Sequence, residues 1–419
     1  MADPSPGTAP HGIPSAREQA AGTAGVAVAI VVMNVAMYGF TVVAARLLGP
    51  TAYGGFFAVV NLMLIVGVLQ LGLQATAARR ISSDPAHARE IARDILRVSF
   101  RAAVLLGVVL LVAAPAVTQL LDLASVRTAL LAAAAAVPLT MSGAQAGVLQ
   151  GERRWGELAV LYLLMGVPRL VAGLALVWWR PTELMAFLGI AIGFVVPWLY
   201  GLRVLRDVGR TDAPDHRHAL GPLVAETSRS SQALLAFLAQ TNTDMLVARV
   251  VLDRGESGLY AAGLLVARAV LFLPQFVVVV AFPSMSAEDG GGRALLRSAL
   301  AVVGLGVLCT AATAVLSDLA LVFVGGSDYA EVRDLLWLFA LLGMATAVVQ
   351  VLVYSALARQ GRGSSAWVWV ALLVMVLLAS TARTVTGLLA VVLVVDLSLL
   401  AALGATAYVG ARRLRSRAA

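Results

Sequence analysis

Charged side chains stand inside stretches of this sequence that are otherwise apolar. Arg169 and Arg268 each lie near the middle of such a stretch, and Asp244 ends the polar run of residues 240–244, Gln-Thr-Asn-Thr-Asp. An isolated charge is very costly to bury in hydrocarbon, so such residues face a water-filled cavity or pair with one another. The chemistry open to them is electrostatic. An arginine can bind an anionic group such as a phosphate, and a carboxylate can bind a cation or a proton.

More than one interpretation stays open for each of these residues. Arg268 binds an anionic ligand, or it forms an ion pair with Asp244 on the neighbouring span, or it does both in turn. The run 240–244, which includes Asn242, lines a wet cavity or breaks the helix, because five polar residues cannot face lipid. Arg169 is a cavity cation, or the partner of a helix carbonyl that the preceding proline leaves free.

Single amides and one further acid add polar groups to other apolar stretches. In a cavity the amides could donate hydrogen bonds to sugar hydroxyls, but a lone amide in a membrane span more commonly holds helices together. Both roles stay open for each residue. These residues are Asn34, Gln70, Gln74, Gln145, Gln350 and Asp396.

The composition explains why the polar residues are so isolated. Apolar residues make up 60% of the 419-residue chain and charged residues 13%, with a mean hydropathy of +0.89, whereas a soluble domain is about 25% charged. The composition therefore predicts a polytopic membrane protein and argues against a soluble enzyme, a nucleic-acid-binding module and a disulfide-stapled domain. The single cysteine, Cys309, cannot form an internal disulfide, and no cofactor, metal site or catalytic residue is expected.

The apolar stretches predict an all-α fold of about 12 membrane-spanning helices. Most stretches reach the roughly 20 residues that a helix needs to cross the hydrocarbon core. A polar connector at 207–222 divides them into two six-helix bundles, at 23–206 and 223–410, between a disordered tail at 1–22 and a basic tail at 411–419. The predicted spans are 24–47, 55–77, 98–120, 127–149, 157–179, 184–204, 228–251, 258–282, 294–316, 334–357, 366–381 and 385–409.

The placement of arginine predicts the topology. All 31 basic residues are arginine: 22 fall in the two tails and the even-numbered loops, seven fall in the odd-numbered loops, and two lie within spans. Positive residues concentrate on the cytoplasmic side of membrane proteins. We therefore expect a multi-pass protein of the plasma membrane with both termini in the cytoplasm. The net charge of +8 then follows from topology and from attraction to anionic lipid headgroups, and it does not indicate nucleic acid.

The two halves of the chain carry a weak internal repeat. Tyr53 and Tyr260 follow the first and seventh spans at an offset of 207 residues, and Gly151 and Gly361 follow the fourth and tenth spans at an offset of 210. An even number of spans in each half places both halves in the membrane in the same sense. Transporters built from such parallel repeats bind substrate between the halves, near the bilayer midplane.

Motifs in both halves resemble those of polysaccharide exporters. Residues 45–54, Ala-Arg-Leu-Leu-Gly-Pro-Thr-Ala-Tyr-Gly, look like the N-terminal signature of that group. On these motifs the chain, over residues 24–410, resembles the Wzx-type oligosaccharide flippases of the multidrug/oligosaccharidyl-lipid/polysaccharide exporter superfamily. The residues of the second half that carry the resemblance are Asp244, Gly258-Leu259-Tyr260, Arg268, Pro274, Phe282-Pro283, Gly325-Gly326-Ser327-Asp328-Tyr329 and Gly361-Arg362.

The resemblance implies a transporter that flips polyprenyl-diphosphate-linked oligosaccharide from the inner to the outer leaflet by alternating access, for surface polysaccharide biosynthesis. It implies a lipid-linked anionic oligosaccharide as ligand, surrounding membrane lipids, and glycosyltransferases and a polysaccharide polymerase as partners. A diphosphate needs positive charge in a wet cavity. The candidate substrate-binding residues are Arg268, Asp244, Arg169, Asn34, Asn242, Gln145 and Gln350.

An ion-coupled multidrug or metabolite antiporter of the same superfamily is the alternative. An antiporter should carry a compact acidic site in its first spans, and the first two predicted spans contain no Asp or Glu. A membrane-embedded transferase or polymerase would need an acid or base at the membrane face, in a long loop or a cluster of acidic and histidine residues. Neither is visible in the sequence, which therefore predicts a transporter and not an enzyme.

Overall fold

The structure, a computed structural model, describes residues 16–210, 220–285, 291–358 and 364–418. These residues form helices and short 3₁₀ segments, with no strand among them. The 3₁₀ segments are η1 (Pro85–His87), η2 (Arg206–Arg210) and η3 (Ser327–Leu335). The helices are α1 (Ala16–Ser83), α2 (Ala88–Leu120), α3 (Val126–Gly151), α4 (Trp155–Trp179), α5 (Glu183–Val204), α6 (Leu220–Val251), α7 (Arg254–Met285), α8 (Gly291–Val315), α9 (Ser317–Val324), α10 (Leu336–Ala358), α11 (Ser364–Ala379) and α12 (Val385–Ala418).

Each predicted membrane span coincides with a helix, so the prediction of an all-α polytopic protein is confirmed. Among the described residues, seven helical stretches are long and apolar enough to cross a membrane. The longest, Gly22–Ser83, contains the first two predicted spans. Gly49 divides it with φ 67° and ψ 172°, a backbone conformation that glycine adopts readily, and Pro50 starts the second half of the helix.

Helices extend into both predicted tails, and one bend was not predicted. α1 begins at Ala16, inside the tail predicted for residues 1–22, and residues 1–15 lie outside the described part of the chain. α12 continues to Ala418, through the predicted basic tail. After α8 the chain bends by 94° into the short helix α9. Ser317 and Asp318 open α9, and small polar residues are typical of a helix start.

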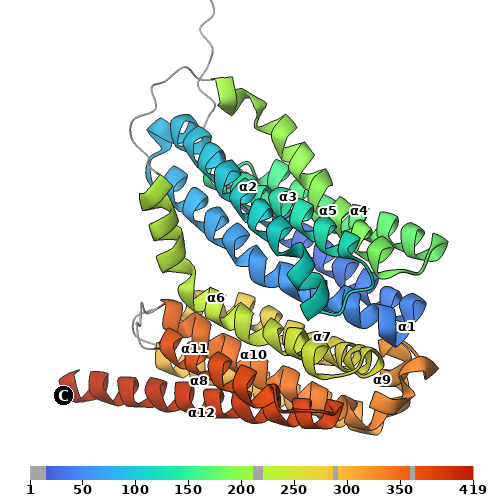
Figure 1. Cartoon of the computed structure of the whole chain (residues 1–419). Helices are drawn as coiled ribbons and strands as arrows, with labels where there is room; N and C mark the ends of the chain where they lie inside the picture. The colour runs from blue at the N-terminus through green and yellow to red at the C-terminus, as the bar shows by residue number, and fades with distance from the viewer. Residues whose placement is uncertain (1–15, 211–219, 286–290, 359–363, 419) are drawn as a thin grey trace, which may run out of the picture.

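The helices form two bundles, which Figure 1 shows one above the other. In the N-lobe, residues 16–210, α1 packs against α3, α4 and α5, and α2 packs against α3. In the C-lobe, residues 220–418, α10 packs against α7, α8 and α12, and α11 packs against α6 and α12. The lobes touch mainly through α1 of the N-lobe, which lies against α6 and α7 of the C-lobe.

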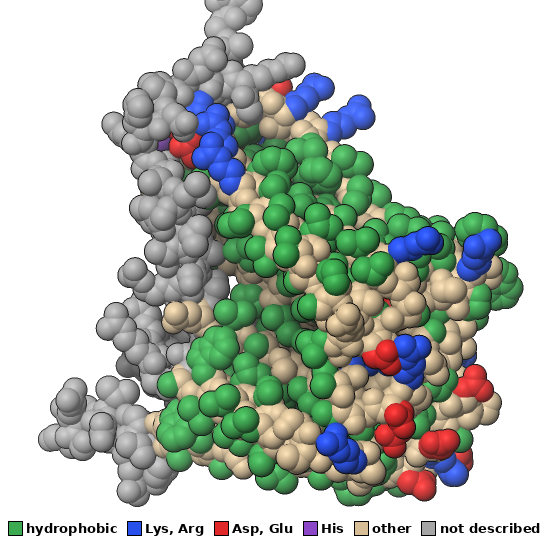
Figure 2. Space-filling model, in the orientation of Figure 1, with side chains coloured by type: hydrophobic (Ala, Val, Ile, Leu, Met, Phe, Trp, Pro, Cys, Tyr) green, Lys and Arg blue, Asp and Glu red, His purple; other side chains and the backbone are tan. Residues whose placement is uncertain are grey.

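The two ends of the bundles carry different loops. We call the end with loops 78–90, 150–155 and 203–210 the arginine-rich end, and the end with loops 120–126, 179–183 and 251–254 the far end. Apolar side chains cover much of the surface between the ends, and charged side chains gather toward the ends (Figure 2). Such an apolar surface suits contact with lipid.

The lobes meet closely at the far end, where the 45–54 signature lies. Gly258 allows α7 to approach α1, because a Cβ atom at Gly258 would lie 1.9 Å from the carbonyl oxygen of Pro50. The Tyr329 hydroxyl of the C-lobe donates a hydrogen bond to the carbonyl oxygen of Ala45 at 2.7 Å. Tyr53 is fully buried and packs edge-on against Tyr329. The signature residues therefore form part of the contact between the lobes.

Candidate functional site

Arg268 lies where the two lobes meet. This α7 residue donates hydrogen bonds through Nη2 to Oδ1 of Asn61, in the second half of α1, and to Oδ1 of Asn242 on α6, the latter at 2.9 Å. Its guanidinium carbon lies 4.7 Å from the centre of the Phe57 ring. Arg268 thus bridges both lobes, and its hydrogen-bond partners are neutral amides.

The ion pair between Arg268 and Asp244, one of the two interpretations left open above, does not form in this structure. The Asp244 carboxylate accepts hydrogen bonds from the Met245 backbone N–H at 2.8 Å and from the Tyr260 hydroxyl at 3.1 Å. Arg268 therefore keeps its positive charge without a carboxylate in direct contact, among the residues that the structure describes.

The polar run 240–244 lies within an unbroken α6, so the interpretation that this run breaks the helix is wrong. Gln240 donates through Nε2 to Oδ1 of Asp396 at 3.0 Å, and Thr346 donates through Oγ1 to the other oxygen of Asp396 at 2.9 Å. All three side chains are buried. One part of the polar run therefore holds the C-lobe helices together, and another part, Asn242, meets Arg268.

A cavity of about 610 Å³ opens inside the N-lobe. Residues of α1, α3, α4 and α5 line it, together with Leu238 of α6. Arg169, on α4, borders this cavity and is only 4% exposed. Its guanidinium carbon lies 5.7 Å from the centre of the Phe40 ring, and its Nε atom is buried without a hydrogen-bond partner in the described residues. Most of the other lining side chains are apolar, among them Met33, Met37, Met63, Leu64, Leu71 and Phe194.

The hydrogen bonds of Arg268 lead toward this cavity but do not place Arg268 in its lining. Asn242, which accepts from Arg268, donates through Nδ2 to the carbonyl oxygen of Leu238 at 2.6 Å, one turn earlier on α6. Leu238 in turn lines the cavity. Of the two arginines that the sequence places inside spans, Arg169 thus lines the N-lobe cavity, whereas Arg268 lies at the lobe contact and is linked through Asn242 to the lining residue Leu238.

The cavity also has a polar corner. Gln74 of α1 donates through Nε2 to Oε1 of Gln150 on α3 at 3.2 Å and to the hydroxyl of Tyr162 on α4 at 2.8 Å. All three residues line the cavity. We call these three residues the Gln74 triad.

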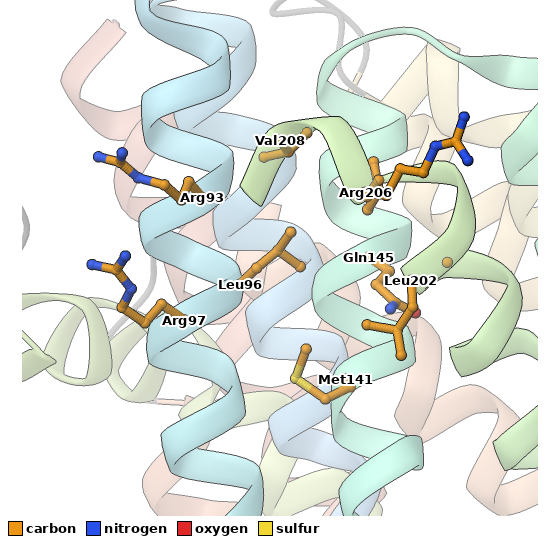
Figure 3. Close-up of a pocket in the computed structure, with 10 residues that line it drawn as sticks. Arg93, Leu96, Arg97, Met141, Gln145, Leu202, Arg206 and Val208 are labelled. Atoms are coloured by element: carbon orange, nitrogen blue, oxygen red, sulfur yellow. The ribbon is translucent and has the colours of Figure 1, made fainter. Parts of the chain in front are cut away.

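The remaining predicted site residues lie elsewhere. Asn34 is half-buried on α1 and does not line the 610 Å³ cavity, and Gln350 is buried on α10. Gln145 borders a different pocket of about 350 Å³, between α2, α3, α5 and η2 (Figure 3), and donates through Nε2 to the carbonyl oxygen of Trp198 at 3.1 Å. The assignment of the seven candidates to substrate binding stays a prediction.

The Gln145 pocket does not concentrate positive charge. Arg93, Arg97 and Arg206 line it, but their guanidinium groups point away from its interior (Figure 3). The side chains that border its centre include Leu96 and Met141. We therefore assign no anion to this pocket.

Charged residues join the lobes at the far end. The Arg254 Nε and Nη2 atoms of the C-lobe each lie 2.6 Å from one carboxylate oxygen of Asp122, in the α2–α3 loop of the N-lobe. These hydrogen bonds hold the pKa of the Asp122 carboxyl below its usual range and raise the pKa of the Arg254 guanidinium. Arg249, 4% exposed, donates to the backbone carbonyl oxygens of Leu121, at 2.8 Å, and Asp122.

Sequence interpretation missed three residues at the site: Asn61, Gln150 and Tyr162. A signal existed for Asn61, because it precedes Arg268 by 207 residues, the offset that separates Tyr53 from Tyr260. Gln150 and Tyr162 carry no comparable signal, since both stand near helix ends where polar residues are common.

The fold is similar to that of solved transporters. An inward-facing multidrug resistance MATE family transporter of the MOP superfamily matches with a TM-score of 0.74 and 13% identity, over 93% of this chain and 100% of that chain. An outward-facing multidrug resistance MATE family transporter matches with a TM-score of 0.55 and 15% identity, over 93% and 96%. A MOP superfamily transporter from Pyrococcus furiosus, whose reverse polarity of the binding pocket suggests a different function, matches with a TM-score of 0.62 and 14% identity. The match covers 92% of this chain and 96% of that chain.

Two lobes of helices, several of them long and apolar enough to cross a membrane, together with this likeness show that the chain has the fold of the MOP superfamily transporters. Residues 20–288 match the family described as Polysaccharide biosynthesis protein, and the chain belongs to that family. The resemblance to polysaccharide exporters that the sequence motifs indicate is confirmed. A comparison with curated protein sequences finds no match.

Proposed function

We propose that this chain moves a polyprenyl-diphosphate-linked oligosaccharide from the cytoplasmic to the outer leaflet of the plasma membrane by alternating access. One observation carries the proposal. Arg169 lines the N-lobe cavity near the middle of its helix, Arg268 stands at the lobe contact near the middle of its own helix, and neither has a carboxylate partner within ion-pair distance in the described residues. A diphosphate cannot cross hydrocarbon without compensating positive charge, and a guanidinium is the side chain best suited to bind phosphate oxygens.

The lining of the cavity supports a ligand with mixed chemistry. Apolar side chains of α1 and α5 supply most of the wall, Arg169 supplies a positive charge, and the Gln74 triad supplies hydrogen-bonding groups. A lipid-linked oligosaccharide combines the same three chemistries. Ligand sites of proteins typically place a few polar groups in a mainly apolar wall in this way.

The contacts between the lobes support a direction of transport. The lobes are joined at the far end by Arg249 and Arg254 against the α2–α3 loop. The higher similarity is to the inward-facing relative, with a TM-score of 0.74 against 0.55 for the outward-facing one. With the arginine-rich end in the cytoplasm, this is the conformation that would load substrate from the inner leaflet. Glycosyltransferases that build the substrate and a polymerase that consumes it are the expected partners.

An ion-coupled antiporter is the second candidate. The buried acids Asp244 and Asp396 favour it, because a carboxylate within a membrane protein can bind a proton or a cation. However, neither acid lines the N-lobe cavity, whereas Arg169 does. An arginine in the cavity wall disfavours a cationic drug as cargo and favours an anion.

Leaflet translocation in proteoliposomes tests the proposal. A fluorescent polyprenyl-diphosphate oligosaccharide is incorporated with the purified protein, and its exposure to a membrane-impermeant quencher is followed with and without a proton gradient. We expect translocation that depends on the protein. Arg268→Ala should slow it about tenfold or more, since a charge-assisted hydrogen bond contributes about 1.5–3 kcal/mol. Arg203→Ala, at an exposed arginine near the end of α5, is the matched control and should leave the rate unchanged.

The contrary outcome is equally specific. If the wild-type protein moves no lipid-linked oligosaccharide and instead drives the efflux of small organic cations down a proton or sodium gradient, the chain is an antiporter and the proposal is wrong.

A further inference from the structure

The Gln74 triad leaves a defined set of hydrogen-bonding groups open to the cavity. Gln74 Nε2 donates to both Gln150 and Tyr162. The Gln74 carbonyl oxygen, the Gln150 amide N–H groups and the Tyr162 hydroxyl hydrogen have no partner among the described residues, and none of these side chains has a polar atom that is buried without a partner. Because all three residues line the cavity, one acceptor and two kinds of donor are available at its wall.

This mixture matches sugar hydroxyls better than it matches phosphate. A hydroxyl group both donates and accepts, whereas an ionised phosphate only accepts. Neighbouring hydroxyls on a sugar ring can therefore satisfy the acceptor and the donors of the triad together. The positive charge that a phosphate requires is supplied elsewhere in the cavity, by Arg169.

The position of the triad fits the same ligand. Arg169 follows Tyr162 by seven residues on α4, a rise of about 10 Å along the helix axis. The triad stands on the side of Arg169 toward the arginine-rich end. Gln150 also borders a second recess of about 490 Å³ at that end, lined by Arg79, Arg153 and Trp155. The hydrophilic part of a ligand could therefore reach the triad from water while its anionic group meets Arg169.

From these contacts we propose that Gln74, Gln150 and Tyr162 form a glycan subsite that binds hydroxyls of the sugar next to the diphosphate. This inference rests on the proposed function, because it assumes that the anionic group at Arg169 is the diphosphate of a lipid-linked oligosaccharide. The triad selects the sugar, and Arg169 holds the diphosphate.

Two probes with the same carrier separate sugar recognition from carrier recognition. One is a short polyprenyl diphosphate that carries a monosaccharide, and the other is the same polyprenyl diphosphate without sugar. Binding of both is measured by fluorescence to the full-length protein in nanodiscs. The variants are Tyr162→Phe, which removes only the hydroxyl, and Gln74→Met, which removes the amide at similar length. Tyr200→Phe is the matched control, because Tyr200 is half-buried on α5 and does not line the cavity.

We expect Gln74→Met to weaken binding of the sugar-linked probe about fivefold to tenfold, since a neutral hydrogen bond contributes about 0.5–1.5 kcal/mol and the amide makes more than one. Tyr162→Phe should act in the same direction with a smaller change. Binding of the bare carrier should stay the same in both variants, and Tyr200→Phe should change neither probe.

The outcomes distinguish this inference from the proposed function. Equal weakening of both probes in the triad variants would show that the triad only maintains the helix packing, and no weakening of either probe would show that it does not touch the sugar. Either result overturns the glycan subsite. If the wild-type protein binds neither probe, the proposed function itself fails.

Discussion

Asn61 and Arg268 occupy corresponding positions in the two halves of the chain and hydrogen-bond to each other across the contact between the lobes. They lie 207 residues apart, the same offset as the fully buried Tyr53 and Tyr260. The second half of α1 and the helix α7 are thus equivalent helices of the repeat that face one another. An amide stands on one side of this contact and a guanidinium on the other, so the two helices meet through one neutral and one positively charged side chain.

Replacing Asn61 by aspartate tests what the Arg268 charge is for. Asn61→Asp keeps the shape of the side chain and the contact with Arg268, but it adds a carboxylate that neutralises the guanidinium. If Arg268 attracts an anionic substrate, translocation should fall about tenfold or more. The guanidinium would then bind the new carboxylate in place of the substrate anion, and that charge-assisted hydrogen bond contributes about 1.5–3 kcal/mol. Folding should be preserved. The measurements are translocation in proteoliposomes and thermal unfolding in detergent.

The control for this substitution is Asn61→Ser, which shortens the side chain and adds no charge. A loss of translocation in Asn61→Ser as large as that in Asn61→Asp would show that the geometry of the contact matters and the charge of Arg268 does not.

Arg169 gives a second test of anion binding, independent of the lobe contact. Arg169→Met retains most of the apolar volume and removes the charge. We expect weaker binding of a bare polyprenyl diphosphate by about tenfold, with thermal stability equal to or above that of the wild type, because the buried guanidinium has no ion pair in the described residues to lose. Arg180→Met, at the exposed end of α4, is the control. A marked drop in stability with unchanged binding would make Arg169 a structural residue.

The helices could be predicted from sequence because their signal is local. Residues 127–149 and 157–179, for example, are apolar over the length of a membrane, and they became α3 and α4 with ends that moved by a few residues. The bend between α8 and α9 was not predicted, since residues 317–324 are no less apolar than α8 and their composition does not mark a change of direction.

The partners of the charged residues could not be predicted in the same way. Asp244 and Arg268 lie on consecutive helices, which suggested an ion pair. In the structure Arg268 turns toward α1 of the other lobe and Asp244 bonds to Tyr260. Which side chain a residue meets across a lobe contact is decided by tertiary packing, and only the repeat offset of 207 hinted at it for Asn61.

Closure of the far end can be followed with a single cysteine. Cys309 is the only native cysteine, so Cys309→Ser gives a thiol-free background. Ala45→Cys then places a thiol at a fully buried position whose backbone carbonyl bonds to Tyr329 of the other lobe. A membrane-impermeant maleimide should label this thiol only when the lobes part at the far end, so its labelling rate reports the open population.

Gly258→Val should part the lobes at the far end. A Cβ atom at Gly258 would lie 1.9 Å from the carbonyl oxygen of Pro50, and backbone cannot yield as a flexible side chain can. We expect faster labelling at Ala45→Cys, because the lobes can no longer close at the far end. Translocation should be slower, because alternating access requires that closed state. Gly255→Val is the matched control, since a Cβ atom at Gly255 meets nothing within 4 Å. Equal labelling in both variants would remove Gly258 from the lobe contact.

The two arginines at the far end should stabilise the contact between the lobes to different extents. Arg254 is half-exposed and binds a half-exposed carboxylate, so Arg254→Ala should raise the labelling rate at most about fivefold, the equivalent of about 1 kcal/mol for a surface ion pair. Arg249 is buried and donates to two backbone carbonyls of the other lobe. Arg249→Ala should therefore have the larger effect, about tenfold or more. The reverse order would mean that the exposed pair holds the far end.

Acid should weaken the far-end contact through Asp122. Because Arg254 depresses the pKa of Asp122 in the closed state, the pair stabilises that state at every pH above the usual aspartate pKa of about 3.9 and loses its effect as the pH falls below it. The labelling rate at Ala45→Cys, divided at each pH by the rate for an exposed cysteine to correct for the falling thiolate fraction, should thus be constant from pH 7 to about pH 4 and should rise below that. Asp122→Asn keeps the backbone carbonyl that Arg249 uses and tolerates the left-handed φ of 44°. It should label faster than the wild type at pH 7 and show no such rise. A rise of equal size in Asp122→Asn would place the acid-sensitive group elsewhere.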